Sequence, residues 1–170
     1  VQAAEAGLIL KNLIGDNRIM FYISPLWRTR QTFENIVQFF SPDQIKWRED
    51  PRIREQEWGH LRPTETSNEI EEARNSFGTF YYRIPDGESC ADVYDRCSSF
   101  FNTLHRDFEK ENFPQNVVIV THGTAIRLFL MRWFHWTVEE FENTANPKNC
   151  EVFHLKREPD QYKFKLVTPM

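Results

Sequence analysis

The sequence has 170 residues, of which 40% are hydrophobic and 27% charged, a composition typical of one globular domain of ordinary size. Lys and Arg number 21 against 25 Asp and Glu, and the resulting net charge of -4 argues against a general nucleic-acid-binding surface. No stretch of about 18 apolar residues is present, so no membrane-spanning helix is predicted.

The N-terminal part of the chain predicts a helix, a strand and a second helix. Apolar residues at helical spacing predict a helix over residues 1–14. Ile19–Ile23 is a short apolar run that is typical of a strand. Ser24 suits a helix N-cap and Pro25 suits the first helical position. The next helix is therefore predicted to begin there and to extend to about residue 40.

A polar, charged stretch follows a short predicted strand at residues 45–47. Residues 48–75 contain Pro51, Pro63 and many charged side chains. They predict a loop excursion with room for one short helix. A loop of this length inside a compact domain is usually functional or disordered, and this one is expected to shape a pocket.

The C-terminal part alternates strands and helices. A capping box at Ser89 and Asp92 predicts the start of a helix, which is followed by a strand at 117–120 and a helix from Gly123. A second capping box, at Thr137 and Glu140, predicts a short helix. Residues 151–155 and 162–167 predict a final hairpin. Strands that alternate with helices indicate a mostly parallel sheet covered on both sides. The predicted fold class is α/β, as one domain over residues 1–170 in a three-layer α/β/α arrangement.

Two polar segments directly follow predicted strands. They are SPLWR at residues 24–28 and THG at residues 121–123, and both lead into helices. In an open α/β sheet, ligands bind at the carboxyl ends of the strands, and a helix N-terminus attracts anions. Arg28 would add a bidentate donor and His122 a titratable group. Together these features are typical of a phosphate site.

Each of these residues also has a structural interpretation. His122 could simply cap backbone groups, and Arg28 could lie on a helix surface beside Arg30. Gly123 could only permit a tight turn. A third stretch, IREQEWGHLRP at residues 53–63, favours the functional interpretation. A charged run is usually a solvated face, but this one lies in the excursion that could fold over the end of the sheet.

Taken in order, the motifs SPLWRTRQT, REQEWG and VTHG resemble those of the histidine phosphatase, or phosphoglycerate mutase-like, superfamily. FYYRIPDGESCADVYDR and MRWFHWTVEEFE extend the resemblance to a subgroup found in plants and fungi. Each motif alone is weak, but the ordered set covers nearly the whole chain. The resemblance implies a phosphoglycerate mutase-like α/β fold.

The resemblance also implies a covalent mechanism. In this superfamily the histidine of an Arg-His-Gly motif attacks phosphorus and becomes phosphohistidine, which splits one difficult displacement into two easier ones. Arginines and a second histidine stabilise the charge on the equatorial oxygens. A glutamate protonates the leaving oxygen and then activates water. No metal or other cofactor is implied, because cationic side chains supply the positive charge.

Matched position by position, the motifs imply roles for residues of this chain. Arg28 matches the phosphate-binding arginine, and His122 matches the second histidine. Glu55 matches the general acid, and Glu57 is the alternative if the register is shifted by two. The expected catalytic residues are His122, Glu55 and Arg28, and the expected substrate-binding groups are Arg28 and the backbone N–H groups of Gly123 and Thr124.

The sequence departs from the family's pattern at the nucleophile. No Arg-His-Gly occurs in the 170 residues. The other histidines, none of which lies in a suitable motif, are His60, His105, His135 and His154. The Arg-His-Gly strand is central to the family's sheet, so its loss would leave backbone groups unpaired at about 1–3 kcal/mol each. A segment carrying it is expected ahead of Val1, and a further omission could lie between Arg62 and Asn75.

Three functions remain open. The first is a metal-independent phosphomonoester hydrolase that acts through phosphohistidine on a small phosphorylated substrate. The second is a phosphoglycerate mutase, which needs extra basic residues, and the excursion supplies Arg48, Arg52, Arg54 and Arg62. The third is a non-catalytic module on the same fold that binds a phosphorylated ligand or a protein.

Compartment and partners are only broadly indicated. Cys90, Cys97 and Cys150 form no CxxC pair, which is typical of a reduced, intracellular protein. No secretory signal pattern is found, so the cytoplasm is the expected location, with nuclear entry left open. No His or Cys pair has zinc-ligand spacing. Aromatic residues at 133–136 could form a surface for an unspecified protein partner, although such clusters are more often core.

Overall fold

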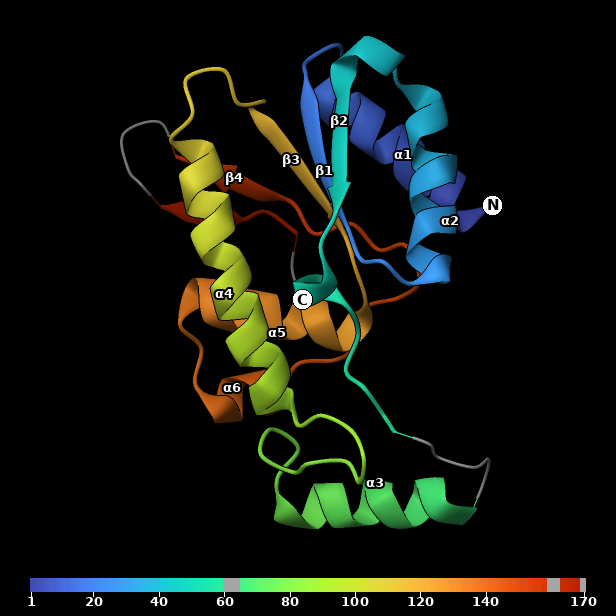
Figure 1. Ribbon diagram of the computed structural model, residues 1–170, viewed down its shortest axis with the longest axis vertical. Coiled ribbons are helices and arrows are strands. Elements are labelled where there is room, and N and C mark those ends of the chain that lie inside the picture. The colour runs from blue at the N-terminus through green and yellow to red at the C-terminus, as the bar shows by residue number, and fades with distance from the viewer. Residues whose placement is uncertain (60–64, 159–162, 169–170) are drawn as a thin grey trace.

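The computed structural model describes residues 1–59, 65–158 and 163–168. In this part of the chain, a three-stranded parallel sheet in the order β2–β1–β3 carries helices on both faces (Figure 1). The strands are β1 (Ile19–Ile23), β2 (Ile45–Glu49) and β3 (Asn116–Val120). The predicted α/β class with a parallel sheet is confirmed, and the predicted bounds of β1 agree with the structure.

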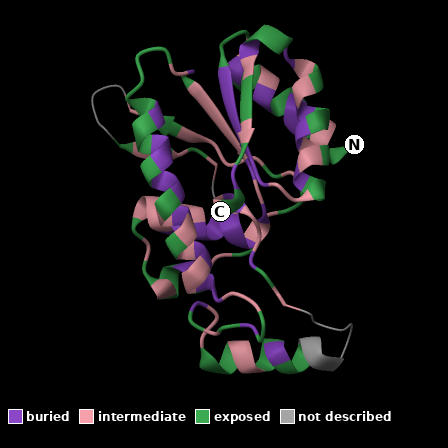
Figure 2. Cartoon of the chain, in the orientation of Figure 1, coloured by how far each residue is buried: buried purple, intermediate pink, exposed green. Residues whose placement is uncertain are grey.

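The central strand β1 packs against different helices on its two faces. Its odd-numbered residues join a core cluster with α1 (Gln2–Ile14) and α2 (Trp27–Ile36). Its even-numbered residues join another cluster with α4 (Cys90–Phe108). Since successive side chains of a strand point to opposite faces, β1 is the middle of three layers. All five of its residues are buried, as Figure 2 shows for the centre of the molecule.

Both predicted capping boxes are present. The Ser89 hydroxyl accepts from the Asp92 N–H at 3.2 Å, and the Asp92 carboxylate accepts from the Ser89 N–H at 2.7 Å, which starts α4. Thr137 and Glu140 start α6 (Val138–Glu142) in the same way. These reciprocal bonds satisfy backbone donors that the first turn of a helix leaves free.

The predicted start of the second helix is wrong. Its N-cap is Leu26, and the helix ends at Ile36, after which a 3-10 turn, Val37–Phe39, continues to about the predicted end. Ser24 is fully buried and lies at the end of β1 rather than at a cap. Its side chain is held by a distant residue, which is described below.

The charged excursion contains more helix than predicted. After β2 a 3-10 turn spans Pro51–Ile53, and α3 (Glu65–Phe77) is 13 residues long. Figure 1 shows α3 at the lower end of the molecule, away from the sheet. Residues 60–64 lie outside the described part of the chain, and with them Arg62 and the first part of the stretch in which a missing segment was predicted.

The C-terminal part contains α5 (Gly123–Phe134) and an antiparallel pair of short strands, β4 (Leu155–Arg157) and β5 (Phe164–Leu166). The predicted hairpin is therefore confirmed with shorter strands, although residue 162 lies outside the described residues. Near the end of α5, the Trp133 ring lies 5.1 Å from that of Phe101 on α4. Trp133 thus packs against the core rather than forming an open surface.

One edge of the parallel sheet borders a large cavity. Among the described residues β3 pairs with β1 alone, and its apolar residues 117–119 are only half-buried. They line a cavity of about 2060 Å³, together with residues of α1, α5 and the hairpin. Strands of a parallel sheet are usually buried on both faces, so the half-buried apolar side chains of β3 are unusual. Among the described residues, none of the helices combines the length and the apolar character that a membrane span requires.

Candidate active site

The site begins where two neighbouring parallel strands end. Ile23 of β1 is the register partner of Val120 of β3, so the residues that follow each strand lie side by side. The Ser24 N–H donates to the Val120 carbonyl at 2.9 Å. The Ser24 hydroxyl lies 2.7 Å from Nε2 of His122. Two segments that are far apart in sequence are thus joined at the carboxyl edge of the sheet.

Arg28 reaches the other nitrogen of the same imidazole. Its Nε donates to Nδ1 of His122 at 3.0 Å. Because arginine can only donate, Nδ1 must accept, and this places the ring proton on Nε2, which donates to Ser24. Arg28 is exposed, and its two Nη groups have no hydrogen-bond partner among the described residues. They are free to bind an anion in the planar, bidentate manner of a guanidinium.

The imidazole of His122 is held neutral. Only 6% of this residue is exposed. Burial lowers the pKa of His122 to about 4, and the charges of Arg28 and Arg96 act in the same direction. His122 is the N-cap residue of α5, but its side chain makes no capping hydrogen bond. The interpretation as a simple helix cap therefore does not account for this histidine.

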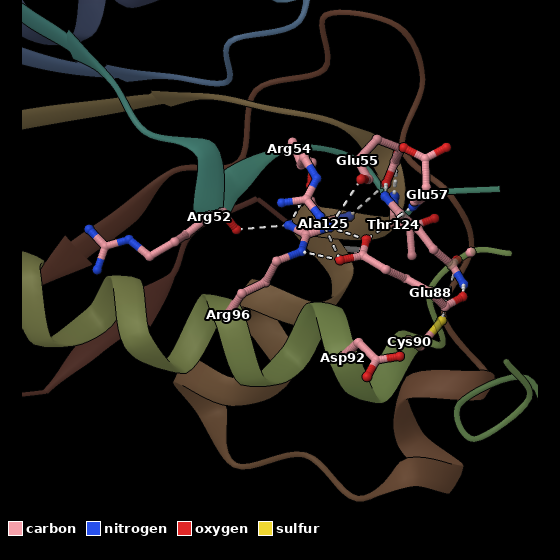
Figure 3. A network of polar contacts seen from close by, with 12 residues as sticks. Arg52, Arg54, Glu55, Glu57, Glu88, Cys90, Asp92, Arg96, Thr124 and Ala125 are labelled. Atoms are coloured by element: carbon pink, nitrogen blue, oxygen red, sulfur yellow. Dashed lines mark hydrogen bonds and ion pairs between the residues drawn. The ribbon is translucent and has the colours of Figure 1, made fainter. Parts of the chain in front are cut away.

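Glu55 lies against the start of the helix that follows His122 (Figure 3). Its Oε2 accepts from the Thr124 N–H at 3.3 Å, and its Oε1 accepts from the Ala125 N–H at 3.2 Å. The same Oε1 accepts from the Gln56 N–H at 3.0 Å. A carboxylate is favoured at a helix N-terminus by the free N–H groups and the helix dipole. This arrangement orients the carboxylate of Glu55.

The other predicted site groups are placed differently. Gly123 is the first residue of α5, so its N–H has no acceptor within the helix. The Thr124 N–H, predicted to face phosphate, is bonded to Glu55 instead. Glu57 is exposed, and its backbone N–H donates to the Glu88 carboxylate at 3.0 Å. Of the two candidate acids, Glu55 is therefore the one that contacts α5.

Four predicted groups line one space. Arg28, Glu55, His122 and Gly123 all border the cavity beside β3. The structure thus brings together residues from the start of α2, the excursion and the start of α5. The arrangement offers a cation, a helix N-terminus and a carboxylate at a single cavity, which suits an anionic ligand with an oxygen to be protonated.

Three arginines of the excursion form ion pairs away from the cavity. Arg48 pairs with Asp107 at 2.7 Å, and Arg52 pairs with Asp50 at 2.6 Å. Arg54 pairs with the Glu88 carboxylate at 2.8 Å. Since each of these cations already has a carboxylate partner, they do not form a free basic surface for a substrate.

Sequence reasoning missed several parts of the site. Ser24 was interpreted as a helix cap, and no sequence pattern signals its contact with His122 across 98 positions. Glu88 and Arg96, which hold the backbone around Glu55, occur in one of the motifs quoted for the family resemblance, but nothing in their spacing indicates that role. Within the described residues, no group of three His, Cys, Asp or Glu side chains could hold a metal ion.

Comparison with known sequences identifies relatives. The family model described as histidine phosphatase superfamily (branch 1) matches residues 1–168. Phosphoglycerate mutase-like protein AT74 of Arabidopsis thaliana is 44% identical over 165 residues, which covers 89% of this chain and 52% of that protein. Broad-range acid phosphatase DET1 of Saccharomyces cerevisiae is 42% identical over 131 residues, which covers 74% of this chain and 39% of that protein. The chain thus spans about half the length of the Arabidopsis protein and a smaller part of the yeast protein.

Comparison with solved structures supports the fold. A mycobacterial glucosyl-3-phosphoglycerate phosphatase in complex with VO3 has a TM-score of 0.77 and 21% sequence identity, and the match covers 98% of this chain and 82% of that one. At this identity the likeness shows the fold. The predicted resemblance, including its plant and fungal character, is confirmed by the family match and by the Arabidopsis and yeast relatives. The chain belongs to the histidine phosphatase superfamily.

Proposed function

We propose that the protein hydrolyses small phosphomonoesters through a phosphohistidine intermediate and without a metal ion. The observation that carries this proposal is the convergence of Arg28, His122 and the start of α5 on one cavity, with Glu55 at its edge. The acid phosphatase name of the yeast relative supports hydrolysis over transfer.

The phosphoryl group would be bound by fixed donors. The two Nη groups of Arg28 offer a bidentate contact to phosphate oxygens. The Gly123 N–H offers a donor at a helix N-terminus, and Nδ1 of His122 holds the Arg28 guanidinium in place. Donors already held in place cost little reorganisation when charge develops in the transition state. This positive environment performs the task that a metal ion performs in other phosphatases.

Glu55 is proposed as the general acid and base. Protonated, it would donate its proton to the leaving oxygen of the substrate. As a carboxylate, it would then take a proton from the water that attacks phosphohistidine. Its contacts with the Thr124 and Ala125 N–H groups support this role, because they orient the carboxylate at the same helix start that receives the phosphate.

The nucleophilic histidine is proposed to lie on a further strand along the open edge of β3. The half-buried apolar residues of β3 and the adjoining cavity support this placement. A parallel strand there would pair with backbone groups that β1 does not use. Its carboxyl end would lie at the same edge of the sheet as His122. No residue in the 170-residue sequence, which lacks Arg-His-Gly, is assigned this role.

Mutase activity is the second candidate and is less well supported. A mutase must retain its phosphorylated product and protect phosphohistidine from water, which requires additional cationic contacts. Arg48, Arg52 and Arg54 of the excursion are already paired with Asp107, Asp50 and Glu88. The mutase-like name of the Arabidopsis relative is the observation that favours this candidate. A non-catalytic module would use the same donors without turnover.

The test uses the full gene product, with its mass and sequence established first. Hydrolysis of p-nitrophenyl phosphate in the presence of a chelator, with an acid-labile phosphoryl label on histidine, is the expected result. Transfer between the hydroxyls of phosphoglycerate without release of phosphate would instead establish a mutase. Binding of inorganic phosphate without turnover by a chain that contains Arg-His-Gly would overturn the proposal in favour of a binding module.

A further inference from the structure

We propose that Arg96 and Glu88 form an ion pair that positions Glu55 for catalysis. The inference rests on the proposed function, in which Glu55 is the acid. Neither side chain is placed in contact with the substrate, so both are positioning residues. Arg96 lies in α4, and Glu88 lies just before that helix. Figure 3 shows the two side chains directed towards the segment that carries Glu55.

All five N–H groups of the Arg96 guanidinium are used. Nη1 donates to the carbonyls of Arg52 at 2.8 Å and Arg54 at 2.7 Å. Nη2 donates to the carbonyl of Glu55 at 3.0 Å and to the Glu88 carboxylate at 2.9 Å. Nε donates to the other oxygen of Glu88 at 3.0 Å. One side chain therefore donates to three backbone carbonyls of residues 52–55, the segment that ends at the proposed acid.

Glu88 holds the same segment from its other end. Its carboxylate accepts from the Glu57 N–H at 3.0 Å and from Arg54 at 2.8 Å. Its backbone N–H donates to the Glu57 carbonyl at 2.9 Å, and its carbonyl accepts from the Gln56 side chain at 2.7 Å. Glu55 thus lies between residues that are fixed on both sides.

The ion pair of Arg96 and Glu88 is largely buried. The side chains of Arg96 and Glu88 are 11% and 14% exposed. Burial acts to raise the pKa of Glu88, but hydrogen bonds from Arg96 and the Glu57 N–H, with the charge of Arg54, hold it below its usual value. A charge-assisted, bidentate pair of this kind has a defined geometry that a flexible surface pair lacks.

This support matters because Glu55 does not lie on a regular element. Residues 54–57 follow a 3-10 turn and belong to neither a helix nor a strand. The direction of the Glu55 side chain towards Thr124 and Ala125 therefore depends on how its backbone is held. Lysine at position 96 would offer three donors on one nitrogen and could not reach the same set of acceptors. The pair is consequently expected to act on the rate of the chemical step rather than on substrate binding.

The experiment compares Arg96→Lys and Glu88→Gln with the full gene product. Arg83→Lys is the matched control, because Arg83 pairs with Asp92 near the same helix start but is 62% exposed. Both test variants are expected to lose about 100-fold in kcat with little change in KM, as a displacement of about 1 Å can cause. Amide exchange at Gln56, Thr124 and Ala125 should accelerate in both, and the control should match the parent protein.

The outcomes separate the two proposals. Unchanged kcat and unchanged exchange at the three amides in both variants would refute the positioning role. A fall in melting temperature alone, with kcat and exchange preserved below the transition, would also refute it. If the parent protein shows no turnover, the proposed function fails, and the exchange rates still decide whether the ion pair holds Glu55.

Discussion

Arg28 and His122 lie 94 positions apart in the sequence and are joined by a hydrogen bond of 3.0 Å between Nε and Nδ1. This contact occupies one nitrogen of the guanidinium and leaves the two Nη groups for a ligand. It also fixes which ring nitrogen of His122 carries the proton. One side chain thereby serves both as a proposed phosphate contact and as the partner that orients the histidine.

The two roles of Arg28 predict that lysine cannot replace it. The three N–H groups of an ammonium diverge from one nitrogen, so they do not reproduce the planar fork that contacts Nδ1 of His122 and two phosphate oxygens. Arg28→Lys in the full gene product is expected to lower kcat/KM for a small phosphomonoester by about 100- to 1000-fold. Arg30→Lys on the same helix is the control, because Arg30 pairs with Glu49 at 2.6 Å. Equal, small effects of the two substitutions would contradict the assignment.

Burial of His122 predicts a pH-dependent stability. Its pKa falls from 6.5 to about 4 on folding, so between these values the unfolded chain binds more protons than the folded one. The free energy of unfolding should therefore fall as the pH is lowered from 7 to 4, by up to about 3 kcal/mol from this group. Urea unfolding at several pH values in this range should show that the free energy of unfolding depends less steeply on pH for His122→Gln than for the parent. Parallel slopes would contradict the prediction.

The position of Glu55 predicts a distinct effect from that of its neighbour Glu57. Glu55→Gln keeps the side-chain shape but cannot transfer the proton, and is expected to lower kcat by about 100- to 10,000-fold. It should also remove one limb of the pH profile. Glu57→Gln, at an exposed residue, should keep kcat within about twofold. A larger effect at Glu57 would show that the acid is two residues further along the chain.

Much of the fold could be predicted because it depends on local patterns. β1 is a continuous apolar run, and the helix starts at Ser89 and Thr137 carry capping boxes. The length of α3 could not be predicted, because Ile70 is the only buried residue among its described side chains. A helix with so little buried surface shows no apolar stripe in its sequence.

The site could be predicted where family motifs supplied it, and less well where contacts cross the fold. Arg28, Glu55 and His122 were found through the motifs, and the structure brings all three to one cavity. The predicted free N–H of Thr124 is occupied by Glu55, because a carboxylate lies where only phosphate was expected. Ser24 was misassigned because a serine before Pro25 fits a helix cap equally well. Only the pairing of β1 with β3 shows that it faces His122.

The buried contact between Ser24 and His122 predicts a stability cost that needs no assay of activity. In Ser24→Ala, the Nε2–H of His122 loses its acceptor in a site where Ser24 is fully buried. A buried donor left without a partner costs about 1–3 kcal/mol, and the free energy of unfolding at pH 7 should fall by that amount. Ser76→Ala, at an exposed residue of α3, is the matched control and should change it by less than about 0.5 kcal/mol. Urea unfolding of the three proteins measures both values, and an equal effect of the two substitutions would mean that the hydroxyl of Ser24 does not satisfy the imidazole.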